Sequence, residues 1–92
     1  MAKEYRKYLK DNCQACGHNG SLFPLDPDHW ITRGARPDLL NDERNIITLC
    51  RKCHSNKGQI GRRSFIKRFP ILINVLENNG FEYDEYMDDW YL

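Results

Sequence analysis

Four cysteines in two Cys-x-x-Cys pairs, Cys13 with Cys16 and Cys50 with Cys53, restrict the fold of this 92-residue chain more than any other feature. Two intervening residues allow a tight turn to direct both sulfurs at one metal ion, and four thiolates complete a closed tetrahedral zinc site. A chain this short buries a small core and often needs such a staple. We therefore predict one structural zinc, with disulfides, buried free cysteines or a redox pair as the alternatives.

The sequence shows neither an export signal nor a membrane span. Residues 1–12 read as a charged amphipathic helix without an apolar run. No stretch approaches the roughly 20 apolar residues that cross a bilayer as a helix. We therefore expect a soluble, cytoplasmic protein.

Charge is distributed very unevenly along the chain. Residues 1–68 hold all 14 Lys and Arg and seven of the 13 acids, whereas residues 69–92 hold the other six acids. A basic body suits a polyanionic partner such as DNA, since each neutralised phosphate releases counterions. Three roles stay open for the acidic tail: it folds back on the basic face, contacts a partner in a larger complex, or keeps the protein soluble.

Hydrophobic periodicity and turn residues predict a small α+β fold. The expected elements are a helix over residues 3–12, a strand over 21–25, a strand over 45–49 and a helix over 51–57. Pro24 and Pro27 restrict the first strand to an edge or to irregular backbone. Gly58, and with certainty Gly61, should stop the last helix.

Residues 62–92 are predicted to form a helical annex within the same domain, which we expect to span residues 1–92. Ser64 is expected to cap a turn, Pro70 to interrupt the helix, and Gly80 to end a second helix. The aromatic residues of the tail should pack against the body, because disordered segments are poor in aromatics.

Further polar residues accompany the cysteines. Asp28-His29 precedes a long loop, Asn45 opens the second strand, and His54 directly follows Cys53. In type, order and adjacency these residues resemble the HNH endonuclease family, with Asp-His as a frequent variant of its His-His pair. The closest resemblance is to the variety framed by two Cys-x-x-Cys knuckles, common in phages and bacterial defence systems, and it covers about residues 13–58. It implies a zinc-stapled ββα-metal (His-Me finger) core and a DNA endonuclease in a bacterial or phage-infected cell.

Phosphodiester hydrolysis requires an activated water and stabilisation of charge on the phosphate. Histidine is suited to take a proton from water because its ordinary pKa of about 6.5 leaves it mostly neutral at pH 7. One hard divalent cation can act as Lewis acid and template. The resemblance implies that Asp28 and His54 hold this cation and that His29 is the general base. Magnesium or manganese suits such a site, and one histidine ligand also permits nickel or zinc.

Several side chains near these positions have two interpretations. Asn45 ties the hairpin loop in place and orients the base, or it touches the metal, and we favour the first. Asp26 is an alternative acid or a turn cap, and His18 is an extra ligand or a hydrogen-bonding loop residue. Lys57 contacts a phosphate or is a solvated helix-end lysine. The predicted DNA-backbone contacts are Arg33, Arg36, Lys57, Arg62, Arg63, Lys67 and Arg68.

Two other functions compete with nuclease activity. The chain can be a non-catalytic zinc-dependent nucleic-acid-binding module, or an accessory partner in a larger phage DNA-processing or packaging complex. Binding alone gives no reason for an Asp-His pair, Asn45 and His54 to coincide at these positions. We therefore favour the nuclease.

Overall fold

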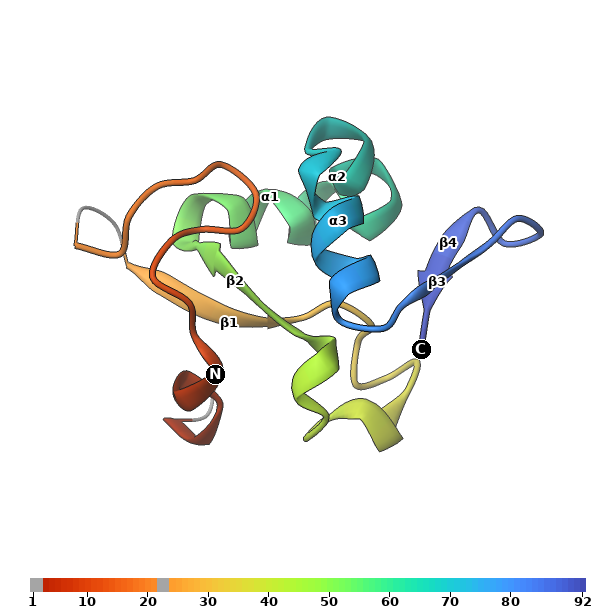
Figure 1. Ribbon diagram of the computed structural model, residues 1–92, viewed down its shortest axis with the longest axis horizontal. Coiled ribbons are helices and arrows are strands. Elements are labelled where there is room, and N and C mark those ends of the chain that lie inside the picture. Colours follow the sequence, from red (N-terminus) through yellow and green to blue (C-terminus); the bar gives the residue numbers. More distant parts are fainter. Residues whose placement is uncertain (1–2, 22–23) are drawn as a thin grey trace.

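The computed structural model describes residues 3–21 and 24–92, which form three α-helices, two short antiparallel hairpins and several 3-10 turns (Figure 1). In chain order the elements are η1 (Lys3–Tyr8), β1 (Leu25–His29), η2 (Pro37–Leu39), η3 (Glu43–Asn45), β2 (Ile46–Cys50), α1 (Arg51–Ile60), α2 (Arg62–Arg68), α3 (Ile71–Asn78), β3 (Glu82–Asp84) and β4 (Asp89–Tyr91). In Figure 1 the α-helices lie above the β1–β2 hairpin and the 3-10 turns lie below it. The predicted small α+β fold is confirmed. Among the described residues, no helix has the length and apolar character needed to cross a bilayer.

The centre of the fold is a strand–strand–helix unit. β1 and β2 pair antiparallel, with Asp28 opposite Ile47 and His29 opposite Ile46. All five residues of β2 are buried. Cys50 ends β2 and caps α1, because its sulfur accepts a hydrogen bond from the amide of Cys53. The predicted order of strand, long loop, strand and helix is therefore correct.

The first strand lies later in the chain than predicted. Of the expected span over 21–25, residues 22–23 lie outside the described part, and β1 begins at Leu25 and continues to His29. Pairing with the buried β2 extends this polar segment, although its own sequence is a weak strand former. The two-stranded sheet leaves an outer edge on β1, so Pro27 is tolerated inside the strand.

Two helix predictions are wrong in length. α1 continues through Gly58, so the predicted stop there is wrong, whereas the predicted stop at Gly61 is confirmed, and the φ of +85° at Gly61 favours glycine. At the N-terminus, only Lys3–Tyr8 is helical, as a 3-10 turn. The chain then runs alongside β2, where the amide of Lys10 donates to the Thr48 hydroxyl at 2.8 Å. This tertiary bond replaces the next turn of helix.

The C-terminal annex is only partly helical. α2 begins at Arg62 directly after Gly61, so the predicted cap at Ser64 is wrong. Pro70 separates α2 from α3, and Gly80 at φ +99° follows the end of α3, as predicted. The two helices supply Phe65, Leu72 and Leu76 to the core, each with 0 % exposure.

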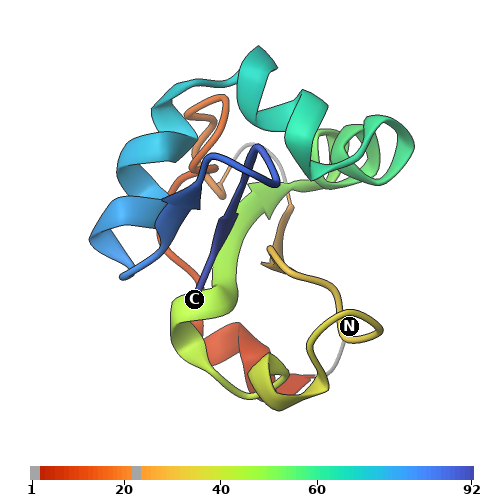
Figure 2. The same ribbon diagram turned by 90° about the vertical axis from the view of Figure 1, so that its right-hand side faces the viewer.

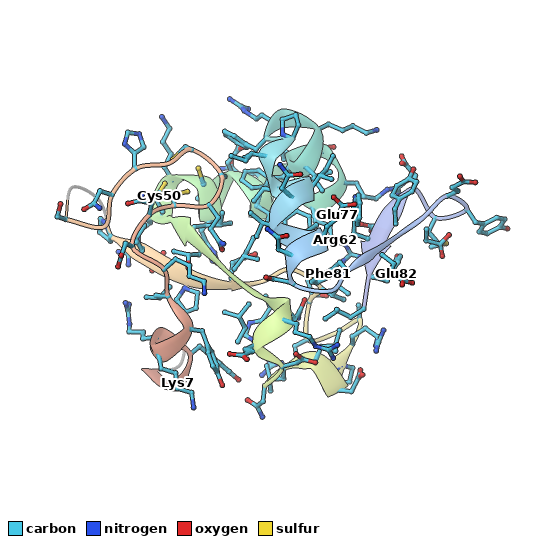
Figure 3. All side chains as sticks on the ribbon, in the orientation of Figure 1. Lys7, Cys50, Arg62, Glu77, Phe81 and Glu82 are labelled. Atoms are coloured by element: carbon cyan, nitrogen blue, oxygen red, sulfur yellow. The ribbon has the colours of Figure 1, made fainter. Side chains whose placement is uncertain are left out.

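The tail folds as a β3–β4 hairpin, which the sequence analysis did not predict. The expected packing of the aromatics is confirmed for Phe81, which is buried at the start of the hairpin, and for Trp90, which packs against the core, but it is wrong for the exposed Tyr83. Tyr86 at the turn is 95 % exposed. Arg62, labelled in Figure 3, holds the hairpin to α2, since its Nε lies 2.9 Å from Asp89 Oδ2. Figure 2 shows the backbone of the hairpin in dark blue, ending at the C-terminus. The acidic tail is therefore a folded element that pairs with the basic body.

Candidate active site

The four cysteine sulfurs form one cluster in which all ligand atoms lie within 4.8 Å of one another. Cys16 Sγ and Cys50 Sγ are 3.7 Å apart, close to the roughly 3.8 Å between neighbouring sulfurs of a tetrahedral site with Zn–S bonds of about 2.3 Å. Both knuckles use the same local bond, from the amide of Cys16 to Cys13 Sγ and from the amide of Cys53 to Cys50 Sγ, each at 3.5 Å. In Figure 3 sulfur atoms gather beside Cys50. These donors fit a structural zinc.

A bound cation would also stabilise the charges of the cysteine cluster. Burial disfavours the Cys13 thiolate, but backbone hydrogen bonds from Cys16, Cys50 and Ala15 outweigh it and lower the pKa of Cys13 to about 7. Burial and the neighbouring sulfurs raise the pKa of Cys53. Four thiolates at this separation repel one another unless a metal neutralises them. All four cysteines are free of disulfides, in agreement with the zinc prediction.

Asp28 and His54 meet where β1 faces α1. Asp28 Oδ1 lies 3.0 Å from His54 Nδ1, and the Asp28 side chain is only 8 % exposed. The buried Nδ1 makes no hydrogen bond of normal geometry with the described residues. Adjacent ligand atoms of an octahedral ion with bonds of about 2.1 Å lie roughly 3.0 Å apart. These two atoms therefore fit neighbouring positions around one small cation.

The Asp28 carboxylate also affects His54 when no metal separates them. Its proximity raises the pKa of His54 above the ordinary range, against the opposing effect of burial. Within the described residues, the cysteine cluster is the only group of three or more potential metal-ligating side chains. Asp28 and His54 thus offer two protein ligands and leave the other positions open to water or substrate, as catalytic sites require.

Lys57 lies beside this pair. It follows His54 by about one turn of α1, its side chain is 9 % exposed, and its Nζ is 3.0 Å from Asp28 Oδ2. The interpretation as a solvated helix-end lysine is therefore wrong. His54 and Lys57 are three residues apart, a spacing that places both side chains on one face of a helix. The sequence therefore did indicate that Lys57 lies beside His54.

His29 points away from Asp28, as expected for neighbours on an extended strand. Its Nε2 lies 2.7 Å from the carbonyl oxygen of Leu40. The ring packs edge-on against Tyr5, with ring centroids 4.8 Å apart. Tyr5 in turn donates a hydrogen bond to the side chain of Asn41 at 3.1 Å. The contacts of the His29 ring with the Leu40 carbonyl and with Tyr5 could not be predicted from the sequence, because no sequence motif indicates either contact.

Asn45 is fully buried, and its side chain hydrogen-bonds to the backbone of the loop that follows β1. Its Oδ1 accepts from the amide of Ile31 at 2.8 Å, and its Nδ2 donates to the Ile31 carbonyl at 2.9 Å. Its own carbonyl accepts from the amide of Trp30 at 2.8 Å. These contacts favour the loop-tying interpretation, in which Asn45 positions the segment that carries His29.

Replacing Asn45 by alanine is expected to destabilise the zinc-loaded protein by about 2–4 kcal/mol, because two buried backbone groups of Ile31 lose their partners. Urea unfolding measures this change. Asn74→Ala, at an exposed position on α3, is the matched control. A loss below about 1 kcal/mol in Asn45→Ala would mean that water replaces these bonds without penalty.

The family of the chain follows from comparison with known proteins. A model of the family described as "HNH endonuclease" matches residues 13–59, slightly more than half of the chain. The chain belongs to the HNH endonuclease family. No curated protein and no solved structure shows significant similarity to it. The matched HNH region contains both knuckles, β1, β2 and nearly all of α1, and membership implies a nucleic-acid substrate.

Two alternative site residues lie apart from the HNH centre. Asp26 forms an ion pair with Arg51 at 3.3 Å, and its charge adds only to the larger effect of Asp28 in raising the pKa of His54. His18 is exposed in the first knuckle, where its carbonyl accepts from the amide of Cys13 at 2.8 Å, and it is not part of the cysteine cluster. The structure thus brings Asp28 to His54 and leaves Asp26 at the outer part of the strand.

The seven predicted DNA contacts around the HNH core fall into two groups. Four form ion pairs with acidic residues: Arg36 with Asp38, Lys57 with Asp28, Arg62 with Asp89, and Lys67 with Asp88. The other three are exposed on the loop after β1 and on α2: Arg33, Arg63 and Arg68. The exposed arginines are the better placed of the seven to reach a phosphate.

Proposed function

We propose that this HNH protein is a metal-dependent DNA endonuclease that hydrolyses phosphodiester bonds. The observation that carries the proposal is the 3.0 Å approach of Asp28 Oδ1 to His54 Nδ1 in a largely buried corner beside the zinc knuckle. The two atoms are within contact distance, and His54 Nδ1 has no hydrogen bond of normal geometry, so a bound cation would supply the missing partner. A binding module has no need for such a pair.

In this proposal His29 activates the water. The Leu40 carbonyl can only accept, so Nε2 of His29 carries the hydrogen and Nδ1 keeps its lone pair for a proton. Tyr5 and Leu40 hold the ring in one orientation, which reduces the entropy lost on reaching the transition state. The proposal requires that one phosphate at the end of β1 reaches both the His29 ring and the cation held at Asp28.

Asp28 and His54 would hold a divalent cation, Mg²⁺ or Mn²⁺, and this cation would supply charge stabilisation at the phosphate and leaving oxygen. The four cysteines would fill all the positions of a tetrahedral zinc ion, which would therefore have a structural role only. Asn45 fixes the loop after β1 through Ile31.

DNA is the proposed substrate, held through its backbone by the exposed Arg33, Arg63 and Arg68. Reduced thiols at the zinc site suit the cytoplasm of a bacterial or phage-infected cell. The acidic hairpin, with Tyr86 exposed at its turn, is the proposed contact with a larger DNA-processing or packaging complex.

Cleavage of supercoiled plasmid by zinc-loaded protein, dialysed free of other divalent ions and then supplied with Mg²⁺ or Mn²⁺, tests the proposal. We expect nicking or linearisation only after metal is added. In His54→Ala, half-maximal cleavage should need at least about tenfold more Mn²⁺, because one of two protein ligands is lost. Gln59→Ala, exposed on the same helix, is the control.

The result can also contradict the proposal. A folded, zinc-loaded wild type that binds DNA but cleaves no plasmid, branched DNA or single strands with either metal would identify a non-catalytic binding module. Cleavage by His54→Ala with an unchanged Mn²⁺ requirement would remove His54 from the cation site.

A further inference from the structure

Lys57 has surroundings that are unusual for a lysine. Its side chain is 9 % exposed, although lysine is among the residues least often buried. Its Nζ lies 3.0 Å from Asp28 Oδ2, 3.4 Å from the carbonyl oxygen of His29 and 5.0 Å from the centroid of the Trp30 ring. A carboxylate, a carbonyl and an aromatic face all attract a cation. The ammonium is therefore held on three sides.

These contacts divide the Asp28 carboxylate between two neighbours. Oδ2 is 3.0 Å from Lys57, and Oδ1 is 3.0 Å from His54 Nδ1. We propose that Lys57 makes Asp28 a one-oxygen ligand and thereby selects Mg²⁺ or Mn²⁺ over Ca²⁺. This inference rests on the proposed nuclease function, because it concerns the same cation site.

The chemistry of the three cations gives the reason. Mg²⁺ and Mn²⁺ suit an octahedral shell, in which a carboxylate supplies one oxygen. Ca²⁺ is larger, takes more oxygens and frequently binds both oxygens of one carboxylate. Lys57 contacts Oδ2 as an ion pair at 3.0 Å, without a hydrogen bond of normal geometry, and its charge would keep this second oxygen from the ion.

A direct DNA contact by Lys57 fits these surroundings less well. To reach a phosphate, the ammonium would have to leave Asp28, whose side chain is 8 % exposed. That movement would leave a buried carboxylate without its positive partner, which is strongly unfavourable. Lys57 is therefore a positioning residue for Asp28, and this role replaces the predicted phosphate contact.

The test measures dissociation constants for Mn²⁺ alone and Ca²⁺ alone on zinc-loaded protein, without DNA, in wild type and Lys57→Met. Methionine keeps the length of the apolar stem and lacks the ammonium. We expect the ratio of the Ca²⁺ constant to the Mn²⁺ constant to fall by about tenfold in Lys57→Met, equivalent to about 1.4 kcal/mol. Lys52→Met, at an exposed position on α1, should leave the ratio unchanged.

A fall of less than about threefold in Lys57→Met, or an equal fall in Lys52→Met, overturns the proposal. A Mn²⁺-bound crystal structure of the wild type provides a second measurement that does not depend on the variant folding. Asp28 should bind the ion through one oxygen while Lys57 stays on the other. Bidentate binding by Asp28, or departure of Lys57 from it, contradicts the proposal even if the protein cleaves DNA.

Mn²⁺ binding by the wild type distinguishes a failure of the proposed function from a failure of the inference about Lys57. If Mn²⁺ does not bind at Asp28 and His54 in the wild type, the cation site itself is absent, and the role of Lys57 falls with it. If Mn²⁺ binds there and the metal preference is independent of Lys57, only the present inference is wrong.

Discussion

Cys50→Ser is expected to lose zinc and to be unfolded at 25 °C. Structural zinc contributes roughly 10–16 kcal/mol of apparent binding free energy in small domains, which equals or exceeds the total stability of about 5–15 kcal/mol of a typical protein. Cys50 has a double effect because its sulfur is also the N-cap acceptor of α1. Loss of this ligand disrupts the connection between β2 and α1. The contact between Asp28 on β1 and His54 on α1 depends on this connection.

Zinc content and far-UV circular dichroism measure the effect, and stripping zinc from the wild type with a chelator should reproduce it. Ser55→Ala, exposed on the same helix, is expected to keep both its zinc and its fold. Cooperative thermal unfolding by a zinc-free wild type would show instead that the apolar core suffices without the metal.

His29→Gln is expected to reduce the rate of plasmid cleavage by about 10²–10⁴-fold, the range typical of a lost general base. Glutamine can still donate a hydrogen bond to the Leu40 carbonyl, which now accepts from His29 Nε2. It has no basic nitrogen, so the variant removes proton transfer while preserving most of the local packing. His29→Ala should show an equal or larger loss, because the contact with Tyr5 also disappears.

Zinc content and Mn²⁺ affinity should be unchanged in His29→Gln, because His29 contacts neither the cysteines nor the Asp28–His54 pair in the described interactions. His18→Ala, a histidine outside the cysteine cluster, is the control and should cleave at the wild-type rate. Undiminished cleavage by His29→Gln would assign the general base to another residue.

Much of the fold follows from local sequence. The Cys-x-x-Cys spacing predicts a zinc knuckle because two residues are enough for one tight turn. The β-branched run before Cys50 predicts β2, and positive-φ glycines at 61 and 80 mark the ends of α1 and α3. The tail was harder to predict, because the short β3–β4 strands derive their stability from packing of Trp90 and from Arg62 rather than from strand propensity.

By itself, the sequence determined the residue types of the site, their order, and the family to which the chain belongs. Only the tertiary structure decided which atoms meet. Pairing of β1 with β2 sets Asp28 against α1, where Lys57 takes one carboxylate oxygen and His54 approaches the other. The same strand pairing directs the His29 ring toward the carbonyl of Leu40, which is not close to His29 in the sequence. The physical reason is that such contacts depend on strand register and helix packing, which are properties of the whole chain and not of any motif.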